Sequence, residues 1–259
     1  MPAYTLKKVW EYCSYNIPFF VFITILIFII NLISDFSVRD PGWEVGFIIS
    51  VSISVILTGY GLSITRDRIN HGHRLPKIMP KDVLDLGIKG SFVYMVFFLF
   101  QGIILTFISH PLNFPAFNLE EMLLDFNKTI YLLFNHNPLH TIIFLIVGGM
   151  VFYITSFFGE VALARLADTK SIMAAFDLKA IYRIIDLFGW RHYARDYTSI
   201  IVVIVILTFI ESHLPVVYGI DDFVGMFLGL LIFAAQYLGI GAVYCNIKDK
   251  ELGRNRAEQ

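Results

Sequence analysis

Five polar or ionisable residues lie within or beside long apolar stretches, where their side chains could contact an ion or a small solute. They are Glu211, His213, Gln101, Gln236 and Glu160. An ionisable group inside a membrane helix is costly, and it usually faces the bundle interior or a cavity. Glu211 and His213 therefore predict a polar pocket. The alternative is that Glu211 lies at the level of the lipid headgroups, where its charge costs little.

The remaining three residues also have two readings each. Gln101 and Gln236 are expected to form hydrogen bonds between helices, worth roughly 0.6 kcal/mol each, and the alternative is contact with a substrate. Glu160 lies near the inner end of its apolar stretch. Like Glu211, it can face the bundle interior or a cavity, or it can sit at the headgroup level, and it can pair with Arg165 or Arg66.

No arrangement of residues points to catalysis or to a bound cofactor. His71 and His73 are close in sequence but have no cysteine or third ligand beside them, so we expect them to be solvated rather than to bind a metal. The sequence contains no Walker loop, dinucleotide fingerprint, zinc-protease helix or nucleophile elbow. A net charge of −1 gives no electrostatic case for nucleic acid. We therefore expect no enzyme activity, no cofactor, no metal and no nucleic-acid partner.

The elements that hold these residues are predicted to be six transmembrane helices. Hydrophobic residues make up 57% of the 259 residues and charged residues only 16%, whereas a soluble domain carries about 25% charged residues. A helix needs roughly 20 apolar residues to cross a bilayer. The predicted spans cover residues 16–34, 44–65, 90–110, 138–160, 197–217 and 223–246. The predicted fold is all-α and polytopic, with a single integral membrane domain over residues 1–259.

The positions of lysine and arginine predict the orientation of these spans. With six spans, 18 of the 20 basic residues fall on the side of the N-terminus, and only Arg39 and Lys128 fall on the other. Because basic loops stay in the cytoplasm, both termini are predicted to be cytoplasmic, in a cell membrane. The candidates for contact with lipid headgroups or partner proteins are Arg66, Arg68, Arg74, Lys77, Lys81, Arg183 and Arg191. Each is worth about 1 kcal/mol near an anionic surface, and the alternative is that they only fix the topology.

Two connecting segments have the periodicity of amphipathic helices that lie along a membrane surface. Residues 119–134 are predicted to do so on the outer side and residues 172–188 on the inner side. A short helix is also expected to begin near Asp82. Glycines near the inner ends of the second, fourth and sixth spans suggest three helical hairpins with closely packed helices. Asn127 begins a glycosylation sequon in an outer segment.

Two runs of residues also carry a family resemblance. The first contains Gly59-Tyr60, Arg66, Gly72, Leu75-Pro76 and Asp85-Leu86-Gly87-Ile88-Lys89-Gly90, and the second contains Val161-Ala162-Leu163-Ala164-Arg165 and Ala174-Ala175-Phe176-Asp177. They resemble an archaeal membrane family known as domain of unknown function 4013. The chain departs from the family pattern at residues 77–82, where members carry acidic and aromatic residues. The resemblance implies a multi-pass protein of an archaeal cell membrane, and it implies no activity.

Two functions compete on this basis. The first is a membrane-organising or accessory protein that binds membrane lipids, partner proteins or further copies of itself through its basic inner segments. The second is a small transporter or channel for an ion or solute, with the intramembrane polar residues along its path. An enzyme acting on lipids would need a cluster of acids or histidines, and the sequence does not contain one.

Overall fold

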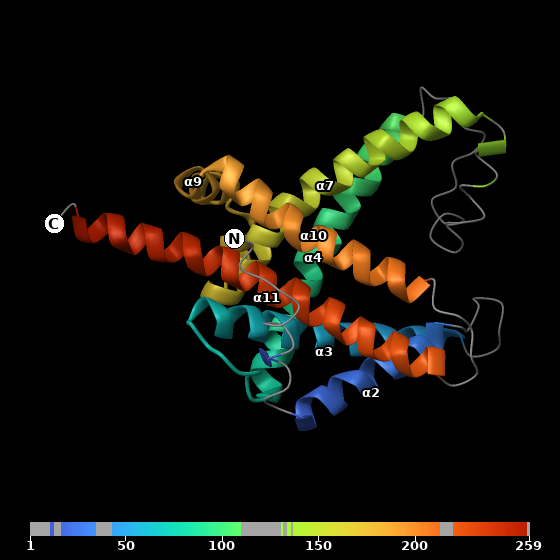
Figure 1. Ribbon diagram of the computed structural model, residues 1–259, viewed down its shortest axis with the longest axis horizontal. Coiled ribbons are helices and arrows are strands. Elements are labelled where there is room, and N and C mark those ends of the chain that lie inside the picture. Colours follow the sequence, from blue (N-terminus) through green and yellow to red (C-terminus); the bar gives the residue numbers. More distant parts are fainter. Residues whose placement is uncertain are drawn as a thin grey trace. The chain divides into compact units, whose positions relative to one another are not determined.

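A computed structural model gives the structure and describes residues 11–12, 17–34, 43–109, 131, 134–135, 137–212 and 220–257. Every regular element among these residues is an α-helix (Figure 1), which confirms the predicted all-α class for this part of the chain. The helices are α2 (Ile17–Ser34), α3 (Trp43–Ile69), α4 (Pro80–Ser109), α7 (Pro138–Thr169), α8 (Ile172–Phe176), α9 (Leu178–Phe188), α10 (Trp190–Ser212) and α11 (Ile220–Ala257). The predicted outer helix, residues 119–134, lies outside the described residues except at positions 131 and 134.

Five of the described helices are long and apolar enough to cross a membrane: α3, α4, α7, α10 and α11. Large apolar side chains on them are exposed, among them Phe47 at 61%, Phe107 at 75% and Met150 at 60%. Extensive apolar surface marks contact with something other than water, and here length and composition indicate lipid. The helix α2 covers the first predicted span and contains no charged residue. The count of six spans stays a prediction.

The observed helices extend beyond the predicted spans at their charged ends. The helix α3 runs on through Arg66 and Arg68, and α4 begins at Pro80 instead of residue 90. The short helix expected near Asp82 is therefore the first part of α4. Hydropathy identifies only the apolar part of a helix. The helical backbone continues into charged turns, where basic residues at the C-terminal end and acidic residues at the N-terminal end interact favourably with the helix dipole. Proline at the first position and an acid in the first turn favour a helix start at Pro80.

The inner segment 172–188 contains two helices where the sequence predicts one. The break falls at Asp177, between α8 and α9. Its carboxylate oxygen Oδ1 accepts a hydrogen bond of 3.0 Å from the backbone N–H of Ala180, so Asp177 caps α9 instead of continuing α8. The same carboxylate lies 3.8 Å from a guanidinium nitrogen of Arg165 in α7.

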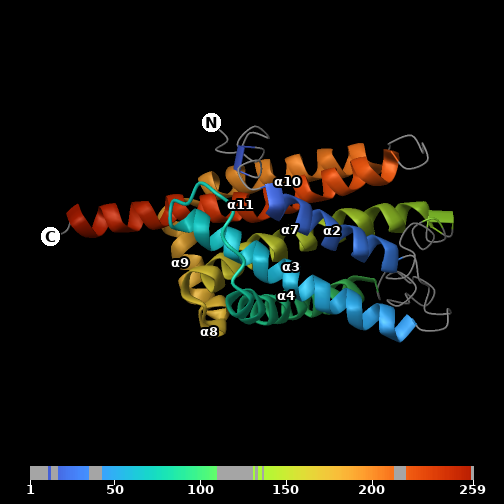
Figure 2. The ribbon, with the colours of Figure 1, turned by 90° about the horizontal axis from the view of Figure 1, so that it is seen from below.

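The chain divides into two compact units where the sequence predicts one domain. Unit 1 contains residues 1–91 and 160–259, and unit 2 contains residues 92–159. Within unit 1, α11 packs against α2, α3, α9 and α10. Figures 1 and 2 show α10 running beside it. The long helices in the described part of unit 2 are the later part of α4 and the earlier part of α7.

Within unit 1, α3 packs closely against both α4 and α11. A Cβ atom on Gly59 of α3 would collide with the carbonyl oxygen of Val83 in α4. On the neighbouring face of α3, the hydroxyl of Thr65 donates a buried hydrogen bond of 2.9 Å to the carbonyl oxygen of Tyr237 in α11. Small residues and buried hydroxyls of this kind hold membrane helices together, because lipid offers no hydrophobic force between them.

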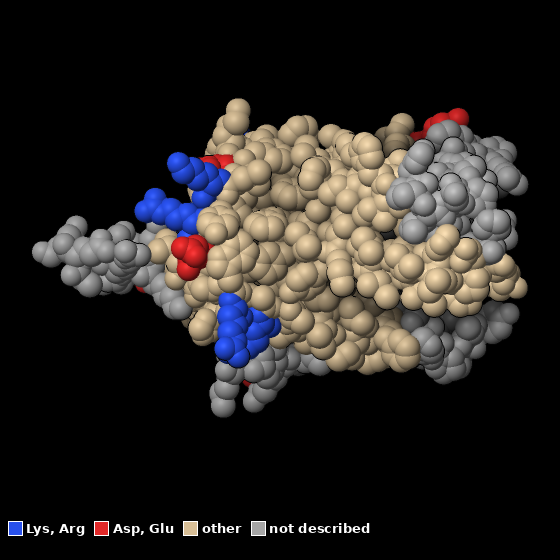
Figure 3. Space-filling view, turned by 90° about the horizontal axis from the view of Figure 1, so that it is seen from above, with Lys and Arg blue, Asp and Glu red and all other residues tan. Residues whose placement is uncertain are grey.

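Among the residues that the structure describes, the charged side chains belong to unit 1. The described part of unit 2 contains no Asp, Glu, Lys or Arg. In Figure 3 the Lys and Arg side chains visible on one face gather at a single end, with acidic side chains beside them. Basic residues of unit 1 lie in the last turn of α3 and the connection after it, after α7, and at the starts of α4, α9 and α10. They include Arg66, Arg68, Arg74, Lys77, Lys81, Lys170, Lys179 and Arg191. We call this the charged end of unit 1.

Candidate functional site

A polar pocket of about 380 Å³ lies at the charged end of unit 1. The end of α3, the connection after it and the first turns of α4 form its walls. Its lining residues are Ser63, Arg66, Asp67, Asn70, Pro76, Lys77, Met79, Asp82, Val83 and Leu86. Two of the seven basic residues that the sequence predicts for headgroup contact, Arg66 and Lys77, are therefore brought to one hollow.

The charges in this polar pocket are unequally satisfied. Asp67 accepts a hydrogen bond of 2.8 Å from the hydroxyl of Tyr12, and Asp82 forms an ion pair of 3.0 Å with Lys170. Within the described part of the chain, Arg66 and Lys77 have no side-chain hydrogen bond and no ion pair. The Lys170 ammonium offsets the charge of Asp82, on which Arg66 also acts, whereas the tyrosine hydroxyl leaves the negative charge on Asp67. Three cations (Arg66, Lys77 and Lys170) against two carboxylates (Asp67 and Asp82) leave a formal charge of +1 at the pocket, which favours an anion.

Tyr60 fixes the connection that carries Lys77. The Tyr60 side chain is buried on α3, and its hydroxyl donates a hydrogen bond of 3.2 Å to the carbonyl oxygen of Pro76. Pro76 immediately precedes Lys77. This bond therefore holds the connection against α3 and fixes the position of the Lys77 backbone. Leu75, also buried, anchors the same stretch by its apolar side chain.

An apolar groove of about 250 Å³ adjoins the polar pocket and shares Val83 with it. It lies along α2, α3 and the start of α4. Its lining residues are Phe22, Ile23, Leu26, Ile56, Leu57, Tyr60, Ile78, Pro80, Val83 and Leu84. A hydrocarbon chain can lie in such a groove, and a phosphate can bind at two free cations. The two hollows together match the two parts of an anionic lipid.

The other basic residues predicted for headgroup contact lie outside this pocket. Arg68 is half-buried and donates a hydrogen bond of 3.2 Å to the carbonyl oxygen of Gly72. The remaining four side chains are exposed at Arg74, Lys81, Arg183 and Arg191. They can contribute charge to a surface, but none of them lines the pocket.

The helix α9 is amphipathic as predicted, but its apolar stripe packs on protein. Ile181, Ile185 and Phe188 are buried, and α9 contacts α10 and α11. The stripe is therefore not free to enter lipid. Instead, the partly exposed Tyr182 and Trp190 pair with ring centroids 5.1 Å apart, and aromatic rings of this kind prefer the boundary between membrane and water.

The predicted intramembrane residues fall into separate places. Gln101 belongs to unit 2, where its amide nitrogen donates a 2.5 Å hydrogen bond to the hydroxyl of Thr155. Gln236 of α11 instead donates to Glu160 of α7 in unit 1, over 3.4 Å. Glu211 lies near the end of α10, and its side chain and the whole of His213 are outside the described residues.

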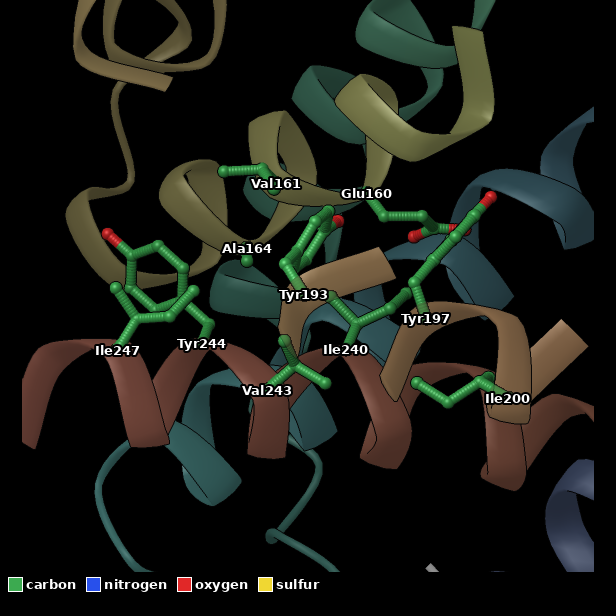
Figure 4. A pocket seen from close by; sticks show the side chains of 10 residues that line it. All are labelled: Glu160, Val161, Ala164, Tyr193, Tyr197, Ile200, Ile240, Val243, Tyr244 and Ile247. Carbon is green, nitrogen blue, oxygen red and sulfur yellow. The ribbon is translucent and has the colours of Figure 1, made fainter. Parts of the chain in front are cut away.

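Glu160 lies at a small cavity between α7, α10 and α11. In Figure 4, Tyr193, Tyr197 and Ile200 of α10 and a row of apolar residues on α11 surround it. The volume of about 10 Å³ is close to what a single water molecule needs. Oxygen Oε2 of Glu160 is buried and has no hydrogen-bond partner among the described residues, which is unusual for a polar atom away from solvent.

Sequence reasoning missed several parts of the polar pocket. Asp67 was not singled out, Asp82 was noted only as a helix start, and Tyr60 entered only through the family resemblance. The only sequence signal was the alternation of Arg66-Asp67-Arg68 at the end of an apolar run, since it places opposite charges at a helix terminus. The apolar groove could not be found because its residues resemble any other lipid-facing residues.

Comparison with known proteins adds a family and no activity. No curated protein and no solved structure matches the chain. The family model described as "Protein of unknown function (DUF4013)" matches residues 45–216, which is more than half of the 259 residues. The match includes α3, the connection after it and α4, and therefore most of the polar pocket. The chain thus belongs to the DUF4013 family of proteins of unknown function.

Proposed function

We propose that this protein is a multi-pass organising or accessory protein of an archaeal cell membrane, and that it binds an anionic lipid at its cytoplasmic side. The charged end of unit 1 is the cytoplasmic end in this proposal, because the predicted inner segments carry 18 of the 20 basic residues. The observation that carries the proposal is the polar pocket, with Arg66 and Lys77 in its lining and no ion pair to either among the described residues, beside an apolar groove.

The lipid would bind by its two chemically different parts. Its phosphate would accept hydrogen bonds from the guanidinium of Arg66 and the ammonium of Lys77, which are stronger than hydrogen bonds between neutral groups. One hydrocarbon chain would lie along the apolar groove, in which Phe22 and Leu57 are among the lining residues. A bound lipid would then contact α2, α3 and α4 at the same time. The proposed organising role is this linking of three helices through a lipid.

The double variant Arg66→Gln/Lys77→Gln is expected to bind an anionic lipid roughly 30-fold more weakly than the unchanged protein. The reason is that each cation is worth about 1 kcal/mol toward a phosphate, and two together reach about 2 kcal/mol. Binding of fluorescent-tailed phosphatidylglycerol to the full-length protein in a neutral detergent measures this, because no charged membrane surface then contributes. Glycerol phosphate, which lacks the tail, should bind far more weakly to the unchanged protein.

The matched control is Lys179→Gln/Arg183→Gln, which removes two exposed charges from α9 outside the polar pocket. Its affinity should stay within about twofold of the unchanged protein. Equal weakening by both double variants would mean that only the total surface charge matters, and the pocket would then have no special part.

A transporter or channel is the second candidate, and the buried, unpartnered oxygen of Glu160 favours it. A polar atom held without a partner in a membrane helix is expensive and is typical of ion and proton paths. In this candidate an ion or solute would pass the cavity between Glu160 and Tyr197.

Proteoliposome flux tests this second candidate. Vesicles that contain a potassium- or pH-sensitive dye should report flux through the unchanged protein and at least about tenfold less through Glu160→Gln, as for the loss of a charged group that contacts the permeating species. Glu211→Gln is the parallel variant for the other intramembrane acid. Absence of flux in the unchanged protein would exclude the transporter for these ions, and equal flux in all three proteins would exclude both acids from the path.

A further inference from the structure

Three side chains with metal-binding atoms meet at the charged end of unit 1, apart from the polar pocket. They are His71, from the turn that ends α3, and Cys245 and Asp249, one turn apart on α11. The sequence predicts no metal here, because Cys245 lies 174 positions after His71 and no cysteine is near the histidine in sequence. Only the packing of α11 against α3 brings them together.

The distances between the donor atoms suit a small tetrahedral ion. Nε2 of His71 lies 3.3 Å from Oδ1 of Asp249 and 3.9 Å from Sγ of Cys245, and that sulfur lies 3.9 Å from Oδ2 of Asp249. Bonds of about 2.0–2.3 Å at tetrahedral angles place nitrogen, oxygen and sulfur ligands about 3.3–3.6 Å apart. The distances from nitrogen and from sulfur to Asp249 end on different carboxylate oxygens. A rotation of this exposed carboxylate and a contraction of a few tenths of an ångström at sulfur would therefore complete the three-ligand arrangement.

The backbone at His71 is a second observation that points to this site. His71 has φ = 60°, and the backbone N–H groups of His71 and Gly72 bond to the carbonyl oxygens of Arg68 and Asp67. These bonds form the motif that ends many helices, whose left-handed position is usually glycine. A histidine there adopts a conformation that glycine would adopt more readily, and such residues cluster at functional sites.

Two cations act on Cys245, and both are engaged elsewhere: Arg68 donates a hydrogen bond to the carbonyl oxygen of Gly72, and Lys248 contacts an acid on another helix. Lys248, adjacent to Asp249 on α11, is engaged in an ion pair of 2.7 Å with Asp168 of α7. Cys245 is buried and carries no disulfide, whereas His71 and Asp249 are exposed. A buried sulfur with two exposed partners gives an ion a route from solvent.

We propose that His71, Cys245 and Asp249 bind a divalent transition-metal ion of the zinc class. Thiolate and imidazole together favour zinc and its neighbours over magnesium or calcium, which prefer oxygen ligands only. The ion would link the turn after α3 to the later part of α11. Three protein ligands leave one coordination position for water or for a further ligand. This site is independent of the proposed lipid binding, since it shares no residue with the polar pocket.

Cobalt substitution tests the site, because Co²⁺ reports its ligands by absorption. The chelator-treated full-length protein in detergent should bind about one Co²⁺ per chain with a sulfur-to-cobalt charge-transfer band. Cys245→Ser should lose this band. His71→Gly should bind more than about tenfold more weakly, since even an outer partner of a metal ligand contributes that much. Its melting temperature without metal should be unchanged or higher, because glycine suits the backbone at this position.

Two other residues with metal-binding side chains provide matched controls. His73→Ala removes the other exposed histidine of the same connection, and Cys13→Ser removes the other cysteine of the chain. Both should keep the charge-transfer band and the affinity. The proposal is overturned if the unchanged protein shows no such band, if Cys245→Ser keeps it, or if His73→Ala weakens binding as much as His71→Gly does.

Discussion

Replacing Gly87 with leucine is expected to destabilise unit 1 by at least about 3 kcal/mol and to leave little folded protein. A Cβ atom on Gly87 of α4 would collide with the carbonyl oxygen of Val55 in α3, just as one on Gly59 would collide with Val83. Backbone atoms cannot move aside as a side chain can, so the helices would have to separate. Overpacking of this kind typically costs 1–3 kcal/mol, and a forced separation of two backbones lies at or above that range. Thermal unfolding in detergent and the monodisperse fraction on size exclusion measure the effect.

Gly102→Leu and Gly149→Leu are the matched controls within unit 2. A Cβ atom at either position meets nothing within 4 Å in the described structure. Leucine is a better helix former than glycine by somewhat under 1 kcal/mol, so both controls should be neutral or slightly stabilising. A Gly87→Leu protein that melts with the unchanged protein would show that α3 and α4 do not approach as closely as the structure has them.

The same contact also positions the polar pocket. Val83 and Leu86, one turn and one residue before Gly87, line that pocket together with residues of α3. A displaced α4 would therefore separate Asp82 from Lys170, whose ion pair of 3.0 Å closes one side. Gly87→Ala, a smaller change, should consequently weaken lipid binding even where the protein still folds.

The apolar stretches predicted the helices well because the cost of exposed peptide groups in lipid leaves a spanning segment little other choice. The centres of the predicted spans at 44–65 and 138–160 lie inside α3 and α7. Their ends were harder to predict. Hydropathy falls at the first charged residue, whereas the backbone hydrogen bonds of the helix continue past that residue. The break at Asp177 shows the same limit, because an N-cap depends on one side-chain conformation.

The sites depend on which helices are neighbours, and the sequence carries little information about that. Pairing with Arg165 or Arg66 was one of the alternatives for Glu160, and the hydrogen-bond partner that the structure gives it is Gln236 of α11. Gln101 and Gln236 looked equivalent in sequence, but one bonds within unit 2 and the other within unit 1. Lipid-facing and protein-facing apolar residues are chemically alike, so periodicity cannot tell them apart as it does in a water-soluble helix.

Replacing Glu160 with methionine is expected to raise the stability of unit 1 by about 1–3 kcal/mol. Oxygen Oε2 of Glu160 is buried with no partner among the described residues, and a buried polar group without a partner costs about that much. Methionine has a similar length and adapts to irregular apolar surroundings such as those made by Tyr197 and Ile240. Among the described residues, the side-chain hydrogen bond removed is the long one of 3.4 Å from Gln236. A rise of roughly 2–4 °C in the melting temperature per kcal/mol should result for a chain of this size.

Two further variants separate this explanation from a general effect of removing polar groups. Glu160→Gln keeps two polar atoms in the same place and should gain little. Gln101→Leu removes a well-formed bond of 2.5 Å to Thr155 and should lower stability by roughly 0.6 kcal/mol, the opposite sign. If Glu160→Met lowers the melting temperature, the carboxyl group holds α7, α10 and α11 together and the structural role is the main one. If it raises the melting temperature and also abolishes flux through proteoliposomes, the acid is retained at a cost in stability because transport needs it.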